Sequence, residues 1–292
     1  MSGVLERFKE LGAIDLLAFL GEWPDRLALR AGPEELSAMA DRLRLRGICV
    51  SHISSVLGHD TRTGNEALFA AAERDKRLWP FAILNPTEQG WEEELAWAAE
   101  KGARGIRLAP GYHGYGLRDT AVAVLLQAAR LHGLPLQVCV RLQDERLQHR
   151  RLRAEPVELH EVAELISAAD GHPLIVSGLR DHERDAVRRF GAARWPRGKV
   201  LFDLWFCNGP IAVISSLCRN GLAEWHGYSS CAPLHTPEAT AFQLAGAAIP
   251  ETDRAALCFS NALSLLGTGN DTPQQLEPAM RLYDKRDFQH RG

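Results

Sequence analysis

Side chains that bind anions or move protons gather in two stretches of this chain, at 107–115 and 141–149. They contribute the candidate site residues Arg107, His113, Tyr115, Arg141, Asp144, Arg146 and His149. A guanidinium group binds carboxylate or phosphate through paired, charge-assisted hydrogen bonds. Histidine and carboxylate side chains act as general acids and bases. We therefore predict that the three arginines hold a substrate anion, and that one of the two histidines or Asp144 transfers a proton.

Further polar residues lie close to the ends of other apolar runs. The additional candidates for substrate binding are Arg180, Asp203, His226 and Cys231. The alternative role for the arginines is structural, because an unpaired buried charge is very costly. In that case Asp203 or Asp15 would pair with an arginine across the molecule. The loop 144–149 would then be a solvated charged stretch or part of a network that holds the loop.

The six cysteines are widely spaced and form no Cys-x-x-Cys pair. This spacing is typical of reduced thiols rather than of a disulfide scaffold. Cys139 and Cys231 allow two chemical interpretations: a thiolate metal site completed by a histidine, or a nucleophilic Cys231 with His113 or His235 as its base. The alternative is that both cysteines are small buried apolar residues.

The composition excludes several classes of protein. The chain has 292 residues, 34 basic against 37 acidic, and a net charge of −3. Without a basic surplus to neutralise phosphates, we expect no nucleic-acid partner. The first twenty residues are interrupted by charges, and no apolar run approaches the roughly 18 residues of a membrane span. We expect a cytoplasmic protein with no membrane partner.

Short apolar runs alternate with helical stretches along the chain. The strands are expected at 12–20, 47–53, 79–85, 103–108, 134–141, 173–177, 200–206 and 223–229, each followed by a helix. Near-continuous apolar strands between helices indicate a parallel sheet covered on both faces. Eight such units fit a (β/α)8 TIM barrel at 1–267, followed by a polar extension at 268–292. A doubly wound open sheet is the alternative, but no glycine-rich nucleotide motif follows the first strand.

In a barrel of this kind the active site lies at the carboxyl ends of the strands. The loops that follow the fourth and fifth strands are the richest in chemistry, and they contain both stretches described above. Arg26 follows the first strand and His235 follows the eighth, so they belong to the same face.

Several segments resemble the amidohydrolase superfamily in its decarboxylase-like branch. They are Ile-Asp-Leu-Leu-Ala-Phe-Leu-Gly at 14–21, Gly-Ala-Arg-Gly-Ile-Arg-Leu at 102–108, Leu-Pro-Leu-Gln-Val at 134–138, Ser-Ser-Cys-Ala-Pro-Leu at 229–234 and Asn-Ala-Leu-Ser-Leu-Leu-Gly at 261–267. Their order and spacing follow the family pattern over nearly the whole chain. The resemblance implies a TIM-barrel hydrolase or a related enzyme.

The same resemblance places other residues where the superfamily carries its metal ligands. These positions fall on Leu17, Phe19, Cys139, Ser177 or Gly178, and Cys231. A catalytic zinc site needs about three protein ligands, and leucine and phenylalanine supply none. From this departure we expect no metal and no cofactor, with zinc as the alternative.

Two functions are compatible with these observations. The first is a metal-independent, amidohydrolase-like hydrolase or lyase that acts on a small anionic or carbonyl-containing substrate. The second is a catalytically inactive relative that binds a ligand or serves as a subunit of a complex, because a fold does not imply a function. The strand ends remain rich in arginine, histidine and aspartate, which favours a retained site for a small anionic ligand. A homodimer is expected from the superfamily.

Overall fold

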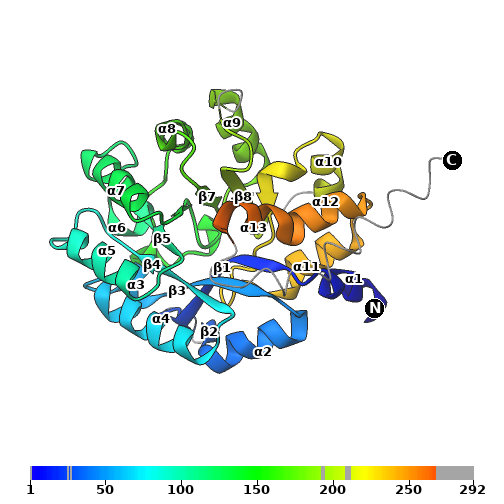
Figure 1. Cartoon of the computed structure of the whole chain (residues 1–292), viewed down its shortest axis with the longest axis horizontal. Coiled ribbons are helices and arrows are strands. Elements are labelled where there is room, and N and C mark those ends of the chain that lie inside the picture. The colour runs from blue at the N-terminus through cyan, green and yellow to red at the C-terminus, as the bar shows by residue number, and fades with distance from the viewer. Residues whose placement is uncertain (1, 25, 27, 192–194, 208–211, 268–292) are drawn as a thin grey trace.

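The computed structural model describes residues 2–267 except 25, 27, 192–194 and 208–211. The C-terminal extension expected at 268–292 lies outside the described residues. Within them the chain alternates strands and helices, as the apolar runs predict (Figure 1). No helix in the described part of the chain has the length and apolar character that crossing a membrane requires.

A curled, nine-stranded sheet forms the centre of the molecule, in the order β2-β1-β3-β4-β5-β6-β7-β8-β9. The parallel strands are β1 (Ile14–Glu22), β3 (Gly47–His52), β4 (Leu78–Ile83), β5 (Gly105–Leu108), β6 (Leu136–Cys139), β7 (Leu174–Ser177), β8 (Val200–Asp203) and β9 (His226–Gly227). Each lies within one of the predicted ranges or within two residues of it. The prediction of repeated strand–helix units around a parallel sheet is therefore confirmed.

The two outer parallel strands, β1 and β9, are not paired as strands in the described structure. The segment that follows β9 approaches β1 instead. A single bridge joins Ala18 to Ala232, and the Phe19 amide donates to the Ala232 carbonyl at 2.7 Å. The Cys231 amide donates to the Leu17 carbonyl at 2.8 Å. The sheet is thus a curled, incompletely closed form of the predicted barrel.

A short antiparallel strand, β2 (Arg30–Ala31), folds back on the end of β1 and was not predicted. Its ladder is only two residue pairs long, Gly21 with Ala31 and Glu22 with Arg30. Gly21 has a φ of +98°, a conformation that glycine adopts without steric cost. So short a strand leaves no alternating pattern in the sequence.

Helices cover the outside of the curled sheet (Figure 1). The longer ones are α1 (Ser2–Leu11), α2 (Pro33–Leu43), α4 (Arg62–Arg74), α5 (Trp91–Glu100), α7 (Thr120–Leu131), α8 (Leu159–Ala169), α9 (Asp181–Gly191), α10 (Val213–Arg219) and α11 (Glu238–Gly246). The shorter ones are α3 (Ser54–Leu57), α6 (Pro110–His113), α12 (Glu251–Ala255) and α13 (Asn261–Leu266), with a π-helical turn at Ala256–Ser260 and 3₁₀ turns at Glu145–Leu147, Arg150–Leu152 and Ala223–Trp225.

Apolar spacing explains how these helices pack. In α7 the buried residues are Val122, Leu125, Leu126 and Ala129, which recur every three or four positions and form one stripe. The opposite face of α7 carries Leu131, whose exposed fraction is 89%. One face of the helix is therefore fixed against the sheet and the other meets solvent.

Two apolar clusters fill the inside of the curled sheet. The first contains Ile14, Leu16, Cys49, Phe81, Ile175 and Leu201, and α13 packs against it with Ala262 and Leu265. The second lies toward the carboxyl ends of the strands and contains Leu17, Phe19, Ile83, Cys139, Trp205, Phe206 and Cys231. The second cluster forms the floor beneath the loops in which the sequence places the site.

Candidate functional site

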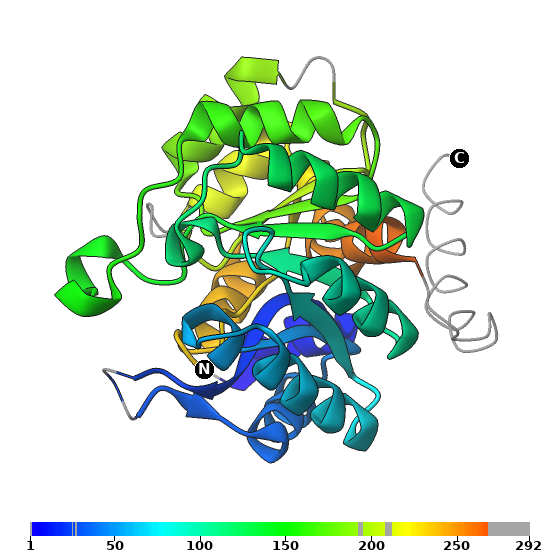
Figure 2. The ribbon, with the colours of Figure 1, turned by 90° about the vertical axis from the view of Figure 1, so that its left-hand side faces the viewer.

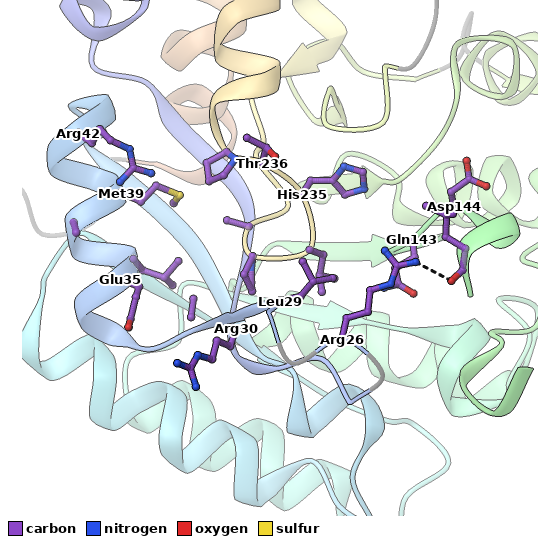
Figure 3. Close-up of a pocket in the computed structure, with 18 residues that line it drawn as sticks. Arg26, Leu29, Arg30, Glu35, Met39, Arg42, Gln143, Asp144, His235 and Thr236 are labelled. Atoms are coloured by element: carbon purple, nitrogen blue, oxygen red, sulfur yellow. Dashed lines mark hydrogen bonds between the residues drawn. The ribbon is translucent and has the colours of Figure 1, made fainter. Parts of the chain in front are cut away.

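A cavity of about 580 Å³ opens at the carboxyl ends of the strands, where the barrel rule places a site. Four segments line it: the hairpin, through Arg26 and Leu29 to Ala31, the helix α2, the loop after β6 and the loop 232–237 (Figure 3). We call it the mouth cavity. The hairpin and the segment after β6 extend from the same side of the molecule (Figure 2). The Arg26 guanidinium joins them by donating to the Leu147 carbonyl at 3.2 Å.

Three arginines line the mouth cavity, and they differ in their partners. Arg42 forms a 2.6 Å ion pair with Glu238, and Arg30 lies 3.8 Å from Glu22. Arg26 is exposed and, in the described structure, forms no ion pair with a carboxylate. Its charge is therefore the most available of the three for an incoming anion.

His235 occupies the wall of the mouth cavity between the α2 side and Asp144 (Figure 3). Its ring lies 4.6 Å from the ring of Trp205, and its amide donates to the Cys231 carbonyl at 3.1 Å. Burial lowers the pKa of His235 below 6.5, while the nearby Asp144 charge acts in the opposite direction. At neutral pH the imidazole is uncharged and can accept a proton.

The loop that carries His235 is anchored to β1 by a buried carboxylate. Asp15 is fully buried and accepts hydrogen bonds from the amides of Leu17 and Ser230, at 3.1 and 2.9 Å, and from the Ser230 hydroxyl at 2.5 Å. Burial raises the pKa of Asp15 to about 6, despite these hydrogen bonds. Cys231 follows with a φ of +53°, and residues 232–237 after it line the mouth cavity.

Asp144 is the one predicted catalytic residue that lines the mouth cavity. The Arg146 side chain binds its carboxylate through Nη2 at 2.6 Å and through Nε at 2.9 Å. The Arg146 amide also donates to it at 3.0 Å. These contacts hold the pKa of Asp144 well below its ordinary value. Asp144 is therefore a fixed negative charge at neutral pH, better suited to orienting a cation than to accepting a proton.

Two arginines predicted to bind substrate are engaged in an ion-pair network. Arg141 binds Glu183 at 2.5 Å and Glu145 at 2.8 Å. Arg180 binds the same two carboxylates, Glu145 at 2.5 Å and Glu183 at 3.2 Å. Two positive charges are thus matched by two negative charges within the protein. This arrangement corresponds to the structural alternative, a network that holds the loop after β6.

Arg107 lies inside the curled sheet and is fully buried. Its guanidinium donates to Gln137 Oε1 at 3.0 Å and to the carbonyls of Cys49 and Ala18 at 2.9 and 3.2 Å. Its partners are thus neutral oxygens, and among the described residues no ion pair links it to Asp203 or Asp15, which corrects that alternative. Carbonyl oxygens from β1 and β3 satisfy the guanidinium because it spans the interior and reaches both strands.

Asp203 and two cysteines lie beneath the mouth, in the barrel interior. Asp203 is 1% exposed, its Oδ1 accepts from the Gly178 amide at 3.1 Å, and its Oδ2 has no hydrogen-bond partner among the described residues. Burial raises the pKa of Asp203 to about 7. Burial also raises the pKa of the Cys139 thiol to about 12 and that of Cys231 well above its ordinary value. As placed here, neither thiol is a thiolate at neutral pH.

The remaining predicted residues lie outside the lining of the mouth cavity. His113 Nε2 lies 3.0 Å from the Ser55 carbonyl, and its ring is 6.1 Å from that of Tyr115. His149 accepts a hydrogen bond from the Arg151 amide at 3.3 Å. His226 lines a different cavity, on the outer side of the sheet.

Sequence reasoning did not select Arg26 and His235 as site residues, although both follow strands. His235 was considered only as a base for Cys231. The hairpin carries Arg26 and the turn after β9 carries His235, and these two elements bring both residues to one cavity. The sequence feature that could have identified both residues is their position after the first and eighth strands. Their loops contain fewer charged residues than the loop after β6, which was therefore favoured.

Comparisons with known proteins agree with this architecture. The amidohydrolase family model matches residues 18–177. A 2,6-dihydroxybenzoate decarboxylase from Rhizobium is similar in structure, with a TM-score of 0.64, 14% identity, and coverage of 87% of this chain and 98% of that one. A 5-carboxyvanillate decarboxylase from Sphingomonas paucimobilis has a TM-score of 0.64 and 13% identity, and covers 88% and 99%. A search of curated proteins finds no match.

One similar structure overturns the expectation that the protein has no cofactor. A dihydroxybenzoic acid decarboxylase from a Polaromonas species, with a TM-score of 0.64 and 13% identity over 87% of this chain and 96% of that one, contains bound manganese and the inhibitor 2-nitroresorcinol. Manganese is also bound in two similar structures of a 5-carboxyvanillate decarboxylase. The prediction of no cofactor was wrong by this comparison, because it rested on the altered ligand positions alone, whereas these similar structures contain manganese.

The residues at the aligned ligand positions of this chain do not form a manganese site. In the described structure no three histidine, cysteine, aspartate or glutamate side chains are grouped to hold a metal ion. Leu17 and Phe19 carry no donor atoms, and Cys139 and Cys231 are protonated thiols, whereas manganese prefers carboxylate, carbonyl and water ligands. The donor set therefore does not fit the metal as arranged.

Proposed function

Because the chain belongs to the amidohydrolase family, whose model matches more than half of it, we propose that it is a hydrolase or lyase for a small anionic aromatic substrate. The mouth cavity is the observation that carries the proposal. Its volume of about 580 Å³ falls within the range of small-molecule sites. We further propose that the curled sheet works as a (β/α)8 barrel, with this cavity at its catalytic face.

Arg26 is proposed as the group that binds the substrate anion. Its guanidinium is exposed at the cavity and donates to the neutral Leu147 carbonyl. A carboxylate bound there would gain charge-assisted hydrogen bonds without breaking an existing ion pair. Arg42, in contrast, would have to leave Glu238.

His235 is proposed as the proton-transfer residue. Its uncharged imidazole accepts a proton from water or substrate, and the nearby Asp144 charge stabilises the imidazolium that forms. In a hydrolysis the imidazolium then returns the proton to the leaving group. In a decarboxylation it gives the proton to the carbon from which carbon dioxide departs. The rings of Trp205 and Phe206 pack behind the imidazole, with centroids 4.6 and 6.5 Å from it, and hold it at the cavity wall.

The roles proposed for Arg26 and His235 do not depend on a metal, since neither residue occupies a position that the alignment gives to a metal ligand. The roles proposed for this chain's own residues are anion binding, charge stabilisation and proton transfer.

The proposal is tested by turnover of hydroxybenzoates and related cyclic carboxylates, measured with added manganese and again after chelation. A reactive substrate should lose at least about a hundredfold in kcat with His235→Asn, in line with the usual value of general acid–base catalysis. His160→Asn, on α8 outside the mouth cavity, is the matched control. If both variants keep wild-type kcat, His235 is not the proton-transfer residue. If ligands bind and none turns over under either condition, the chain is a binding protein instead.

A further inference from the structure

A second cavity, of about 400 Å³, lies on the outer side of the sheet between α9 and α10. Figure 1 shows these two helices as neighbours beside β7 and β8. His226 and Leu222 contribute to its lining from the start of β9 and the turn before it. It shares no lining residue with the mouth cavity, so nothing proposed above uses it. We call it the outer cavity.

Three arginines of the described chain line the outer cavity. Two of them, Arg188 and Arg219, have at most one long ion pair within the protein. Arg219 is exposed at the end of α10 and forms no ion pair in the described part of the chain. Arg188 lies 3.9 Å from Asp185, and its buried Nε has no hydrogen-bond partner among the described residues. Buried donors in native proteins are nearly always bonded, so the Arg188 Nε points to an acceptor that the protein does not supply.

The third arginine fixes one wall of the cavity. Arg184 is buried and binds Asp181, and it also donates to the carbonyls of Leu179 and Asp203 at 3.4 and 3.2 Å. Asp181 and Asp185 offset two of the three positive charges. His226 adds none at neutral pH, because burial lowers its pKa well below the ordinary value. The lining therefore retains a net positive charge.

The α10 side of the cavity has an apolar wall, bordered by Arg219 and interrupted by Ser216 and Asn220. Val213 and Leu217 of α10 and Leu222 of the following turn face the same cavity as the arginines. Cationic groups beside an apolar surface match a molecule with anionic oxygens on a small hydrophobic body. Neither an inorganic ion nor an uncharged molecule would use both walls.

We propose that the outer cavity is a second binding site, for a small organic anion that carries a phosphate or carboxylate group on an apolar body. Arg188 and Arg219 bind the anionic group, and Val213, Leu217 and Leu222 contact the body. This site is independent of the proposed catalytic function, since the two cavities have no residue in common.

Isothermal titration calorimetry of the full-length protein tests this site with phenyl phosphate, benzoate and inorganic phosphate. Every sample carries Arg26→Gln, which is expected to weaken binding at the mouth cavity about tenfold, so that binding there contributes less to the signal. We expect phenyl phosphate or benzoate to bind with one site per chain, and inorganic phosphate to bind at least about tenfold more weakly because it leaves the apolar wall bare. The stronger of the two organic probes identifies the anionic group.

Arg188→Gln and Arg219→Gln are each expected to weaken the organic probe about tenfold, the effect of removing one charge-assisted contact. Arg189→Gln removes the same charge from α9 but does not line the cavity, and it should leave the affinity unchanged. Arg219 is exposed, so its variant remains informative if Arg188→Gln fails to fold. Absence of binding by either organic probe, or an equal loss with Arg189→Gln, would overturn the proposal.

Discussion

Replacing Asp203 by asparagine should stabilise the protein above neutral pH, because Asp203 is a buried carboxyl that lacks a partner for one oxygen. Its Oδ1 accepts from the Gly178 amide at 3.1 Å, and asparagine Oδ1 would keep that bond. Its Oδ2 has no hydrogen-bond partner in the described structure, so little compensates the charged form for its burial. The nearby Ser177 hydroxyl favours the charged form, but burial dominates.

The magnitude follows from the two protonation states. Burial raises the pKa of Asp203 from 3.8 to about 7, and at about 1.4 kcal/mol per pKa unit the charged carboxylate lowers the free energy of unfolding by up to about 4 kcal/mol. Because the folded-state pKa is the higher one, no stability is lost below pH 3.8. The loss grows between pH 4 and 7 and is complete above pH 7. Asparagine does not titrate and escapes this loss.

Urea unfolding at pH 4.5 and at pH 8 measures the effect. The free energy of unfolding of Asp203→Asn, minus that of the wild type, should increase by a few kcal/mol between pH 4.5 and pH 8. Asp185→Asn, whose side chain is 60% exposed, is the control and should show no comparable shift. A difference for Asp203→Asn that does not change with pH would refute the reasoning.

Three further outcomes follow from the packing and the site. Arg141→Gln should cost about 3–5 kcal/mol by urea unfolding, because it leaves Glu183 buried with a weaker partner set, and adding Glu183→Gln should restore part of the loss. Leu125→Ala should cost about 2–5 kcal/mol, whereas Leu131→Ala on the exposed face of the same helix should stay within about 0.5 kcal/mol; equal losses would contradict the packing described for α7. In the pH profile of kcat/KM, the limb assigned to His235 should fall below pH 6.5, since burial lowers its pKa, and a limb above pH 7 would contradict that assignment.

The sequence predicted the repeating architecture well, because buried parallel strands and amphipathic helices leave strong apolar patterns. The run at 173–177 became β7, and Leu125 and Leu126 face the sheet as their spacing indicates. The β1–β2 hairpin escaped prediction, since a ladder of two residue pairs has no such pattern. It nonetheless supplies Arg26 to the mouth cavity.

The candidate site was predicted less completely, because residue type and strand position do not reveal pairing. Arg141 and Arg180 were expected to bind substrate, yet Glu145 and Glu183 already match their charges. Glutamates three or four residues away from an arginine are compatible with either role, and only the fold decides between them. Whether these arginines contact substrate stays a prediction, as do the homodimer and the cytoplasmic location.

The altered ligand positions show how far a single sequence can mislead about cofactors. Leucine and phenylalanine at 17 and 19 supply no ligand, which led to the expectation of no cofactor. Similar structures with bound manganese contradict that expectation. The identity of a metal's ligands depends on how side chains from distant strands converge, and an alignment of short motifs does not contain that information.

The central claim, that the mouth cavity binds an anionic substrate through Arg26, is tested most directly by calorimetric titration of a hydroxybenzoate into the wild type and two variants, with manganese present. Arg26→Gln should weaken binding about tenfold, as expected for one charge-assisted contact. Arg74→Gln, at the end of α4 and outside the mouth cavity, should leave the affinity unchanged. Wild-type affinity in Arg26→Gln, or the same loss in both variants, would contradict the claim.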